Sequence, residues 1–403
     1  MPGILTGLRV IDCGTYIAGP AAAAILSDFG ADVIKIERPP YGDPYRYLQH
    51  VGGMPVCEQN YCWILDDRNK KSVALNLGDS EAREALLRLV KSADVFITNY
   101  QPQLQRKFRV EYADLAEVND RLIYASVTGY GENGEDAEKP GFDATAYWAR
   151  SGLMFSMHNG DGEPTQSPAG FGDHPTSMTL FAAIMLGLYQ RQITGRGTKV
   201  GTSLMANGAW SNGCAIQAAL CGAEFHPKWT RKAAINPLVN HYVARDGHRL
   251  FFCLLDAARD WPNLCRALGL DVDDPRFSSP AARRENSAAL IASMDAVIGQ
   301  NDLAHWARIF KECDLIWGPV PSSAEVARDP QMERNGVFVE IRPGLKTLQN
   351  PITVAGVEKE KPRMAPGIGE HTREVLESAG YTSEEIGQMI DRGAALTTNT
   401  ANY

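Results

Sequence analysis

Short apolar segments alternate with longer helix-forming segments along the first 130 residues. Five short segments have the length and the Val, Ile and Leu content of buried strands, namely Arg9–Asp12, Val33–Glu37, Val73–Leu77, Val95–Thr98 and Leu122–Val127. Three longer segments predict helices, and these are Ala21–Phe29, Ser80–Ser92 and Tyr112–Val118. Strands that alternate with helices are typical of an α/β fold with a mostly parallel sheet.

The middle of the chain is more helical and contains a change of composition. We expect a strand over Lys199–Ser203 and helices over Asp143–Arg150, Met178–Gln192 and Leu204–Leu220. The segment Ala223–Pro237, with its His, Pro, Lys and Trp residues, predicts a domain boundary. Residues 225–328 are then a smaller α+β domain, in which Asp260 caps a helix. Residues 1–224 form the first part of a larger domain, which residues 329–403 rejoin.

Composition and charge exclude several classes of protein. Apolar residues make up 44% of the 403 residues and the net charge is −8, which favours neither nucleic acid nor an anionic membrane as a partner. No apolar segment approaches the ~20 residues that a membrane span needs, and the N-terminus lacks a signal-peptide pattern. The eight cysteines form no Cys-x-x-Cys pair and the histidines have no metal-ligand spacing. We therefore expect a cytoplasmic protein without a metal.

Two features bear on a nucleotide ligand. The glycines of Gly129–Gly134 match a dinucleotide-binding spacing, but an acidic segment broken by Pro140 follows them where a helix would be needed. We interpret this segment as a loop over a ligand or a plain surface turn. Basic residues gather near the ends of predicted strands, at Arg38, in Arg68–Lys71 and in Arg106–Arg109. In an acidic protein this grouping suggests a polyphosphate at the carboxyl edge of the sheet, with Arg38 on a phosphorylated ribose.

Asp173 is the candidate for catalysis. It follows Gly172 directly and precedes a long apolar run that begins at Met178. A carboxylate in this position can be a helix cap, which is the commoner case. It can also be a nucleophile that the helix dipole keeps ionised, with an ordinary pKa near ~3.9.

Several motifs, in order along nearly the whole chain, resemble the class III CoA-transferases. They are Gly7–Asp12, Ala18–Pro20, Gly30–Glu37, Gly42–Asp43, Asn69–Ser72, Asn99–Tyr100, Thr194–Gly197 and Gly369–Thr372. This family includes formyl-CoA and carnitine CoA-transferases and the α-methylacyl-CoA racemases. The resemblance implies a Rossmann-like large domain with a parallel sheet, a smaller α+β domain and an interlocked homodimer.

The resemblance also assigns residues. Asp173 matches the catalytic aspartate of the family, and eight positions match its CoA contacts: Ile17, Ala18, Arg38, Leu75, Asn99, Tyr100, Lys107 and Tyr130. Two of the matched positions, and one further position, depart from the family pattern. Ile17 replaces a substrate-contacting Gln, which argues against oxalate; Lys107 replaces an Arg; and Thr128 stands where a Lys is expected. The glycine-rich active-site loop of formyl-CoA transferase has no counterpart, since residues 235–240 read INPLVN.

The implied activity is CoA transfer between an acyl-CoA and a carboxylic acid, through an aspartyl mixed anhydride and an aspartyl-CoA thioester. CoA is a substrate, and no cofactor is implied. The alternative within the family is a racemase, which needs a His and an Asp as bases on opposite faces of the substrate. Phe142 occupies the position of that His, so the racemase is disfavoured. The apolar residues Ile17, Tyr16 and Phe142 favour an acyl group larger than formyl.

Overall fold

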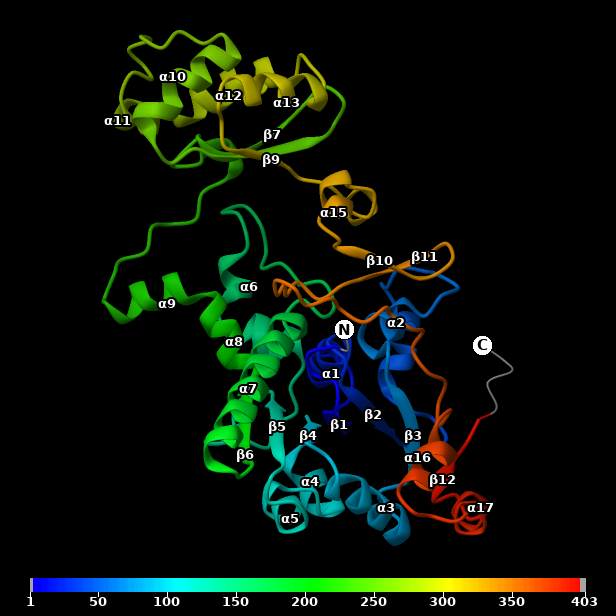
Figure 1. The fold of residues 1–403 in the computed structure, drawn as a ribbon. Helices are drawn as coiled ribbons and strands as arrows, with labels where there is room; N and C mark the ends of the chain where they lie inside the picture. Colours follow the sequence, from blue (N-terminus) through cyan, green and yellow to red (C-terminus); the bar gives the residue numbers. More distant parts are fainter. Residues whose placement is uncertain (1–2, 399–403) are drawn as a thin grey trace. The chain divides into compact units, whose positions relative to one another are not determined.

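The computed structural model describes residues 3–398, which divide into two compact units (Figure 1). Unit 1 combines the chain up to Ser156 with Gln166–Cys221 and with the chain from Gly336 onward. Unit 2 consists of Met157–Thr165 and Gly222–Asn335. Both ends of the chain therefore contribute to the larger unit, whereas the smaller unit comes mainly from one continuous segment.

A seven-stranded sheet forms the centre of unit 1, in the order β12-β3-β2-β1-β4-β5-β6. Six of these strands are parallel, and β12 pairs antiparallel with β3 at one edge. The strands are β1 (Arg9–Asp12), β2 (Asp32–Glu37), β3 (Lys71–Leu75), β4 (Val95–Thr98), β5 (Ile123–Thr128), β6 (Thr198–Ser203) and β12 (Ala395–Leu396). The strand order reverses between β1 and β4, as in Rossmann-like sheets. The predicted α/β fold with a mostly parallel sheet is confirmed.

Neighbouring strand residues point to opposite faces of the sheet, and each face has its own core. On one face, residues such as Ile11 and Phe96 pack with the helices α3 (Ser80–Lys91), α5 (Tyr112–Val118), α16 (Thr372–Ser378) and α17 (Ser383–Asp391). On the other face, residues such as Val10 and Ile97 pack with α1 (Ala18–Asp28) and α7 (Asp173–Thr194). The first residues of α1 and α7 therefore lie near the carboxyl ends of the central strands.

The remaining elements of unit 1 surround this framework. They are α2 (Tyr61–Asp67), α4 (Pro102–Phe108), α6 (Leu153–Ser156), α8 (Leu204–Ser211), α9 (Gly213–Leu220), the 3-10 helix Pro44–His50, the π-helix Asp143–Ala149 and the hairpin β10 (Phe338–Arg342) to β11 (Leu345–Leu348). Two expectations are corrected here. The helix expected from Met178 begins at Asp173, and the helix expected over Leu204–Leu220 is divided into α8 and α9 at Asn212.

Unit 2 packs helices on a small antiparallel sheet of β7 (Val239–Val243), β8 (Arg249–Cys253) and β9 (Trp317–Pro319). Its helices are α10 (Ala257–Leu268), α11 (Pro280–Glu285), α12 (Ser287–Ile298), α13 (Leu303–Glu312), α14 (Ser323–Val326) and α15 (Pro330–Arg334), besides the 3-10 turn Arg231–Ala233. Asp260 does not cap α10, contrary to the prediction. Asp256 does, by accepting hydrogen bonds from the N–H groups of Ala258 and Arg259, and Asp260 is buried one turn later.

None of the helices within residues 3–398 is long and apolar enough to cross a membrane.

Candidate active site

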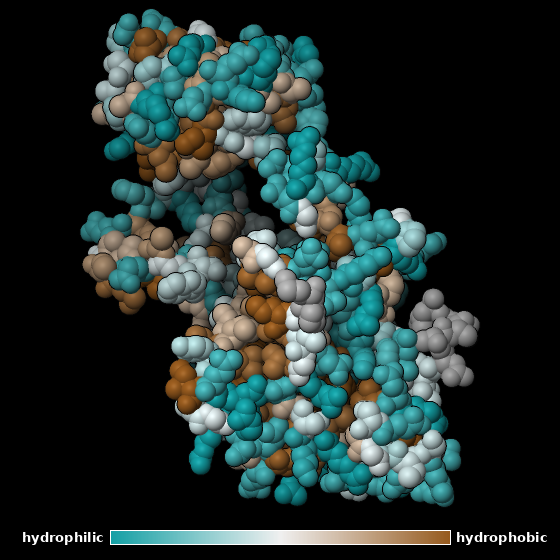
Figure 2. Space-filling model, in the orientation of Figure 1, coloured by the Kyte–Doolittle hydropathy of each residue, from teal (hydrophilic) through white to brown (hydrophobic). Residues whose placement is uncertain are grey.

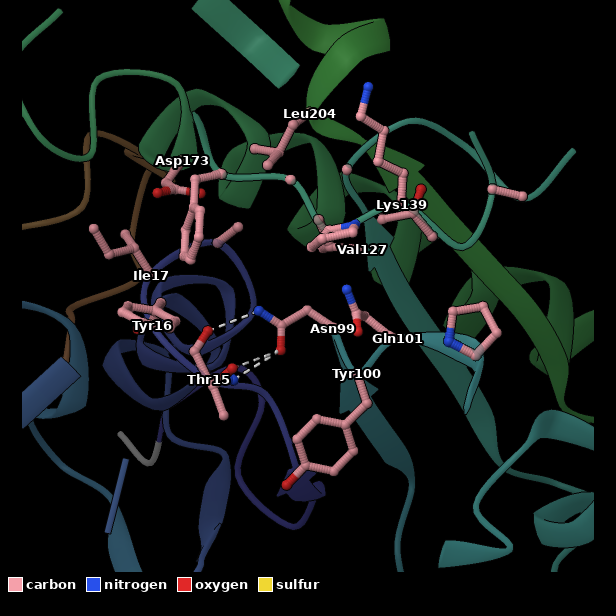
Figure 3. Close-up of a pocket in the computed structure, with 18 residues that line it drawn as sticks. Thr15, Tyr16, Ile17, Asn99, Tyr100, Gln101, Val127, Lys139, Asp173 and Leu204 are labelled. Atoms are coloured by element: carbon pink, nitrogen blue, oxygen red, sulfur yellow. Dashed lines mark hydrogen bonds between the residues drawn. The ribbon is translucent and has the colours of Figure 1, made fainter. Parts of the chain in front are cut away.

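A pocket lies at the carboxyl ends of β1, β4 and β5, where the strand order of the sheet reverses (Figure 3). Its walls come from the loops that follow these strands, from residues 137–142, from the first residue of α7 and from Leu204. In open α/β sheets, ligands bind outside the carboxyl ends of the strands at this switch point. The topology therefore marks this pocket as the candidate site.

Asn99 holds the loop that follows β1. Its side-chain oxygen accepts a hydrogen bond from the Thr15 N–H at 2.8 Å, and its amide nitrogen donates to the Thr15 carbonyl at 2.7 Å (Figure 3). The next residue, Tyr16, has a φ of 60° and donates its N–H to Asp43 at 3.0 Å. A left-handed tyrosine is uncommon and persists only where its surroundings fix it, so this loop is held in one conformation.

A buried cluster of charged side chains supports the same loop from beneath. Lys35 donates to the Gly14 carbonyl at 2.6 Å and pairs with Asp43 at 2.7 Å. Lys70 pairs with Asp12 at 2.9 Å and with Asp67 at 2.8 Å. All five charged side chains are shielded from solvent, and their attraction to one another offsets the free-energy cost of removing them from water. The cluster ties β1, β2 and α2 together under the floor of the pocket.

Asp173 lines the pocket as the first residue of α7. Gly172 precedes the helix without any side-chain cap, and no hydrogen bond to the Asp173 carboxylate occurs among the described residues. The side chain is half-buried. Burial, followed by the charge of Asp143, raises the pKa of Asp173 to about 7, although His174 opposes this. The carboxylate accepts no hydrogen bond from the first turn and so is not a cap, and its pKa lies above the expected ordinary value because the side chain is removed from water.

The side chain of His174 lies outside this pocket and is held by two acceptors. Its Nδ1 lies 3.0 Å from the Gly170 carbonyl oxygen, and its Nε2 lies 3.2 Å from Oδ1 of Asp66. The other oxygen of Asp66 accepts a hydrogen bond of 2.5 Å from the Tyr45 hydroxyl. Burial opposes protonation of His174, but Asp66 overrides it and raises the pKa of His174 to about 9.

Apolar side chains form the part of the pocket next to Asp173. Tyr16 and Phe142 meet edge to face, with ring centroids 5.3 Å apart, and Ile17 is buried beside them. In Figure 3 Asp173 lies above Ile17 and Tyr16, and Lys139 lies toward the opposite side of the view. The carboxylate thus faces a site with an apolar wall, and Lys139 lines another part of the same pocket.

Three comparisons with known proteins identify the family. The sequence profile described as CoA-transferase family III matches residues 5–372. The chain belongs to CoA-transferase family III. It is 30% identical to the (R)-2-hydroxy-4-methylpentanoate CoA-transferase of Clostridioides difficile, over 96% of this chain and 98% of that protein. It is 31% identical to the cinnamoyl-CoA:phenyllactate CoA-transferase of Clostridium sporogenes, over 96% of each.

A solved structure supports the same assignment. A CAIB/BAIF family protein from Brucella suis superposes with a TM-score of 0.82 at 26% identity, covering 94% of this chain and 100% of that one. The predictions that the chain belongs to this family and is an enzyme of the CoA-transferase class are confirmed.

The structure brings together about half of the residues matched to this family's site. Asp173, Ile17, Ala18, Asn99 and Tyr100 line the pocket, as does Phe142. The other four matched positions, Arg38, Leu75, Lys107 and Tyr130, are not among the lining residues. Their roles as CoA contacts stay predictions.

These four residues differ in their accessibility. Arg38 is exposed directly after β2, where its guanidinium is open to a ligand. Lys107 lies in the last turn of α4, 5.8 Å from the ring of Phe108. Leu75 is 1% exposed and its side chain belongs to the sheet core. Tyr130 is packed beneath Lys139.

Most of the basic residues expected to bind phosphate have partners within the protein. Arg68 pairs with Asp28, and Lys70 belongs to the buried cluster. Arg106 pairs with Glu138 at 2.6 Å. Glu37, beside Arg38, is buried and accepts hydrogen bonds from Arg46 and Ser72, so its carboxylate is engaged within the protein. The polyphosphate interpretation is therefore wrong for Arg68 and Lys70, because buried carboxylates already satisfy them.

The glycine segment and two further residues complete the description. Residues 131–142 contain no helix, which excludes the dinucleotide-binding arrangement, and Gly129 lines the pocket. Sequence reasoning missed the positions of Asp143 and Lys139 at the site. Nothing local to either residue distinguishes it, because both depend on how the loop before the π-helix folds back over β5. Among the described residues, no cluster of His, Cys, Asp and Glu could hold a metal ion.

Proposed function

We propose that the protein transfers CoA from an acyl-CoA to a carboxylic acid, with Asp173 as the nucleophile. The observation that carries this proposal is a carboxylate at the switch-point pocket with no hydrogen-bond partner among the described residues. A structural aspartate normally accepts hydrogen bonds when half-buried. One without them, beside an apolar wall, is available to react with a bound carbonyl group.

The proposed reaction proceeds through covalent intermediates on Asp173. The carboxylate attacks the thioester carbonyl and the C–S bond breaks. CoA leaves as a thiolate, and the acyl group remains on Asp173 as a mixed anhydride. The thiolate attacks the aspartyl carbonyl, which forms an aspartyl-CoA thioester and releases the first acid. The second acid attacks this thioester, and the same two steps in reverse give the new acyl-CoA and restore Asp173. Neither a metal nor a redox cofactor takes part, and CoA is a substrate.

The proposed substrates are acids with an apolar side chain. Among the side chains of Ile17, Tyr16 and Phe142, only the Tyr16 hydroxyl can donate a hydrogen bond. A dicarboxylic acid such as oxalate would therefore find few donors here for its second carboxylate. Two relatives are named for (R)-2-hydroxy-4-methylpentanoate and phenyllactate, which carry a branched and an aromatic group. We expect such 2-hydroxy acids to be better acceptors than oxalate.

A test uses cinnamoyl-CoA with phenyllactate and follows CoA exchange by mass spectrometry. Asp173→Ala should fold and lose all transfer, because it removes the nucleophile. The matched control is Asp79→Ala, which removes a genuine cap of α3, where Asp79 accepts from the N–H groups of Glu81 and Ala82. That change should cost about 1 kcal/mol of stability without loss of transfer. Normal transfer by folded Asp173→Ala would disprove the mechanism.

Covalent capture provides a second test. Cinnamoyl-CoA followed by hydroxylamine should modify the peptide that contains Asp173, because an acyl anhydride or thioester on a carboxylate reacts with this amine. A turning-over enzyme whose Asp173 peptide stays unmodified would instead support direct transfer between the two bound substrates.

We further propose that the protein is a homodimer of the cytoplasm. Exposed apolar side chains follow one stripe of α7 at Leu186, Tyr189 and Ile193, and continue at Trp210 and Leu220. In Figure 2 brown atoms gather on the part of unit 1 that carries α7, α8 and α9. All eight cysteines are unpaired, which is usual in a reducing compartment. Sedimentation should give a dimer, and Leu186→Glu with Ile193→Glu should reduce it to monomers.

A further inference from the structure

His174 lies next to Asp173 in the sequence, but the two side chains face different pockets. Asp173 lines the pocket at the strand ends, whereas His174 lines a neighbouring apolar pocket with Ala21 and Met178. Successive residues of a helix point about 100° apart, so the imidazole cannot occupy the place of the carboxylate. Any influence of His174 on the reaction must therefore pass through Asp173.

The contacts of His174, together with its raised pKa, favour a proton on both ring nitrogens. A backbone carbonyl can only accept, so Nδ1 donates to Gly170 at 3.0 Å. One oxygen of the buried Asp66 side chain accepts from Tyr45, and the other lies 3.2 Å from Nε2, where a proton on Nε2 completes the pair. An imidazole that donates from both nitrogens is a cation.

The other charged groups around this imidazole are few and accounted for. Arg68 lines the same neighbouring pocket, but both nitrogens that face Asp28 are engaged in a bidentate pair at 2.6 and 3.0 Å. The Tyr45 hydroxyl serves Asp66 as a donor. On the side of the active pocket, the nearby charges are Asp173 itself and Asp143, whose carboxylate accepts from the Gly172 N–H at 3.4 Å. His174 is therefore a cation that pairs with Asp66 and lies next to Asp173 at the start of α7.

The imidazole also fixes the turn that leads into Asp173. The Gly170 carbonyl accepts from both the backbone N–H and the ring of His174. Gly170 has a φ of 74°, and a Cβ atom there would lie 3.1 Å from the His174 ring and 3.1 Å from Ile17. The turn is thus closed between the imidazole on one side and a residue of the active pocket on the other.

We propose that His174, held by Asp66, is a positioning residue that keeps Asp173 ionised for attack and fixes the turn that presents it. This inference rests on the proposed function, because it concerns the same carboxylate. Asp143 acts in the opposite direction, since its negative charge disfavours a second carboxylate beside it. The charge state of Asp173 is then set by its burial and by the charges of Asp143, His174 and Asp66, among which His174 alone favours ionisation.

The pH dependence of kcat/KM tests this balance, since it reports ionisation of the free enzyme. With cinnamoyl-CoA and phenyllactate, the acid limb of His174→Gln should move up by about one pH unit, as expected for loss of a nearby opposite charge. Activity should fall roughly tenfold at a pH below the limb and return toward the wild-type value at a pH well above it. The Gln side chain can still donate one hydrogen bond to Gly170.

Two further variants keep the proposal falsifiable if His174→Gln does not fold. Asp66→Asn leaves the ring in place but removes the reason for its charge, and should shift the limb in the same direction by a smaller amount. Asp143→Asn should shift it in the opposite direction. The matched control is His248→Gln in unit 2, where an exposed histidine pairs with Asp246 and Glu325. It should leave the limb unchanged.

The outcomes separate this inference from the proposed function. An equal loss of activity at every pH in His174→Gln, with the limb unmoved, would reduce His174 to a structural residue and overturn the inference. Asp173→Asn decides the other question, because full transfer by that variant would overturn the proposed function itself. An inactive Asp173→Asn with an unmoved limb in His174→Gln and Asp66→Asn would overturn the inference alone.

Discussion

Replacing Asp173 with Asn should make the folded protein more stable at pH 8, although it abolishes the proposed reaction. The two side chains have the same shape, so the change removes only the charge. The folded-state pKa of Asp173 is about 7, compared with an ordinary 3.8. The folded protein therefore binds this proton more tightly than the unfolded chain does, so the carboxyl lowers the stability of the fold progressively as the pH rises from 3.8 to about 7.

The magnitude follows from the difference between the two pKa values. A difference of about three pH units corresponds to about 4 kcal/mol, at ~1.4 kcal/mol per unit. The carboxylate is only half-buried, so solvent screens part of this penalty, and the first turn of α7 favours a negative charge by up to about 1 kcal/mol. We expect a net gain of about 1–2 kcal/mol for Asp173→Asn at pH 8. About half of the gain should remain at pH 5.5, which lies about midway between the two pKa values. At that pH the wild-type carboxyl is largely protonated in the folded protein and largely ionised in the unfolded chain.

Urea unfolding of both proteins at pH 5.5, 7 and 8.5 measures this difference. The gain should grow with pH and level off above the folded-state pKa. A lower stability of Asp173→Asn at pH 8.5 would refute the reasoning, since it would show that the charge of Asp173 stabilises the first turn of α7. A gain that does not vary with pH would mean that the two side chains differ in packing rather than in charge.

Three further outcomes are expected. Arg38→Ala should raise KM for the acyl-CoA roughly tenfold with little change in kcat, because a charged hydrogen bond to a phosphate stabilises the ground state and the transition state equally. Steady-state kinetics measures both constants, and a loss that appears in kcat would contradict this prediction. Gly170→Ala should destabilise the protein by about 1 kcal/mol more than Gly247→Ala in thermal unfolding, since both have positive φ but only Gly170 would contact a ring. The wild-type enzyme should not exchange the Cα proton of a 2-methylacyl-CoA in deuterated water, because Phe142 cannot carry a proton and His174 lies outside the pocket. Deuterium incorporation at the rate of CoA transfer would show that another base serves.

The sheet of unit 1 could be predicted because its strands are short, apolar and regularly separated by helices. The predicted strand Val95–Thr98 agrees with β4 at both ends, and so does the predicted helix Tyr112–Val118 with α5. The errors lie where tertiary contacts decide. α7 begins at Asp173, before its apolar run, because the turn at Gly170 is closed by His174 rather than by a local capping pattern. The edge strand β12 contains two residues and has no pattern of its own.

The candidate site could be predicted only in part, for a similar reason. Asp173 and Asn99 stand in recognisable local sequences beside a helix start and a strand end. Asp66 lies 108 residues before His174, and no local signal connects them. Basic residues mislead in the same way, since Lys70 looks like a phosphate ligand until the structure shows Asp12 and Asp67 on either side of it. Charge in a sequence shows that a partner is needed, but only the fold shows whether the partner is a ligand or another residue.

The pairing of β12 with β3 has a consequence for how the chain is made. A ribosome releases β3 more than 300 residues before Ala395, which pairs with Leu75 of that strand. During this interval the open edge of β3 can pair with a strand of another nascent chain. Most of unit 2 is continuous in sequence, so it can complete its own core before β12 is available to pair with β3 in unit 1. The last strand to be synthesised therefore closes the sheet, and a chain that stops shortly before it exposes an edge that promotes aggregation.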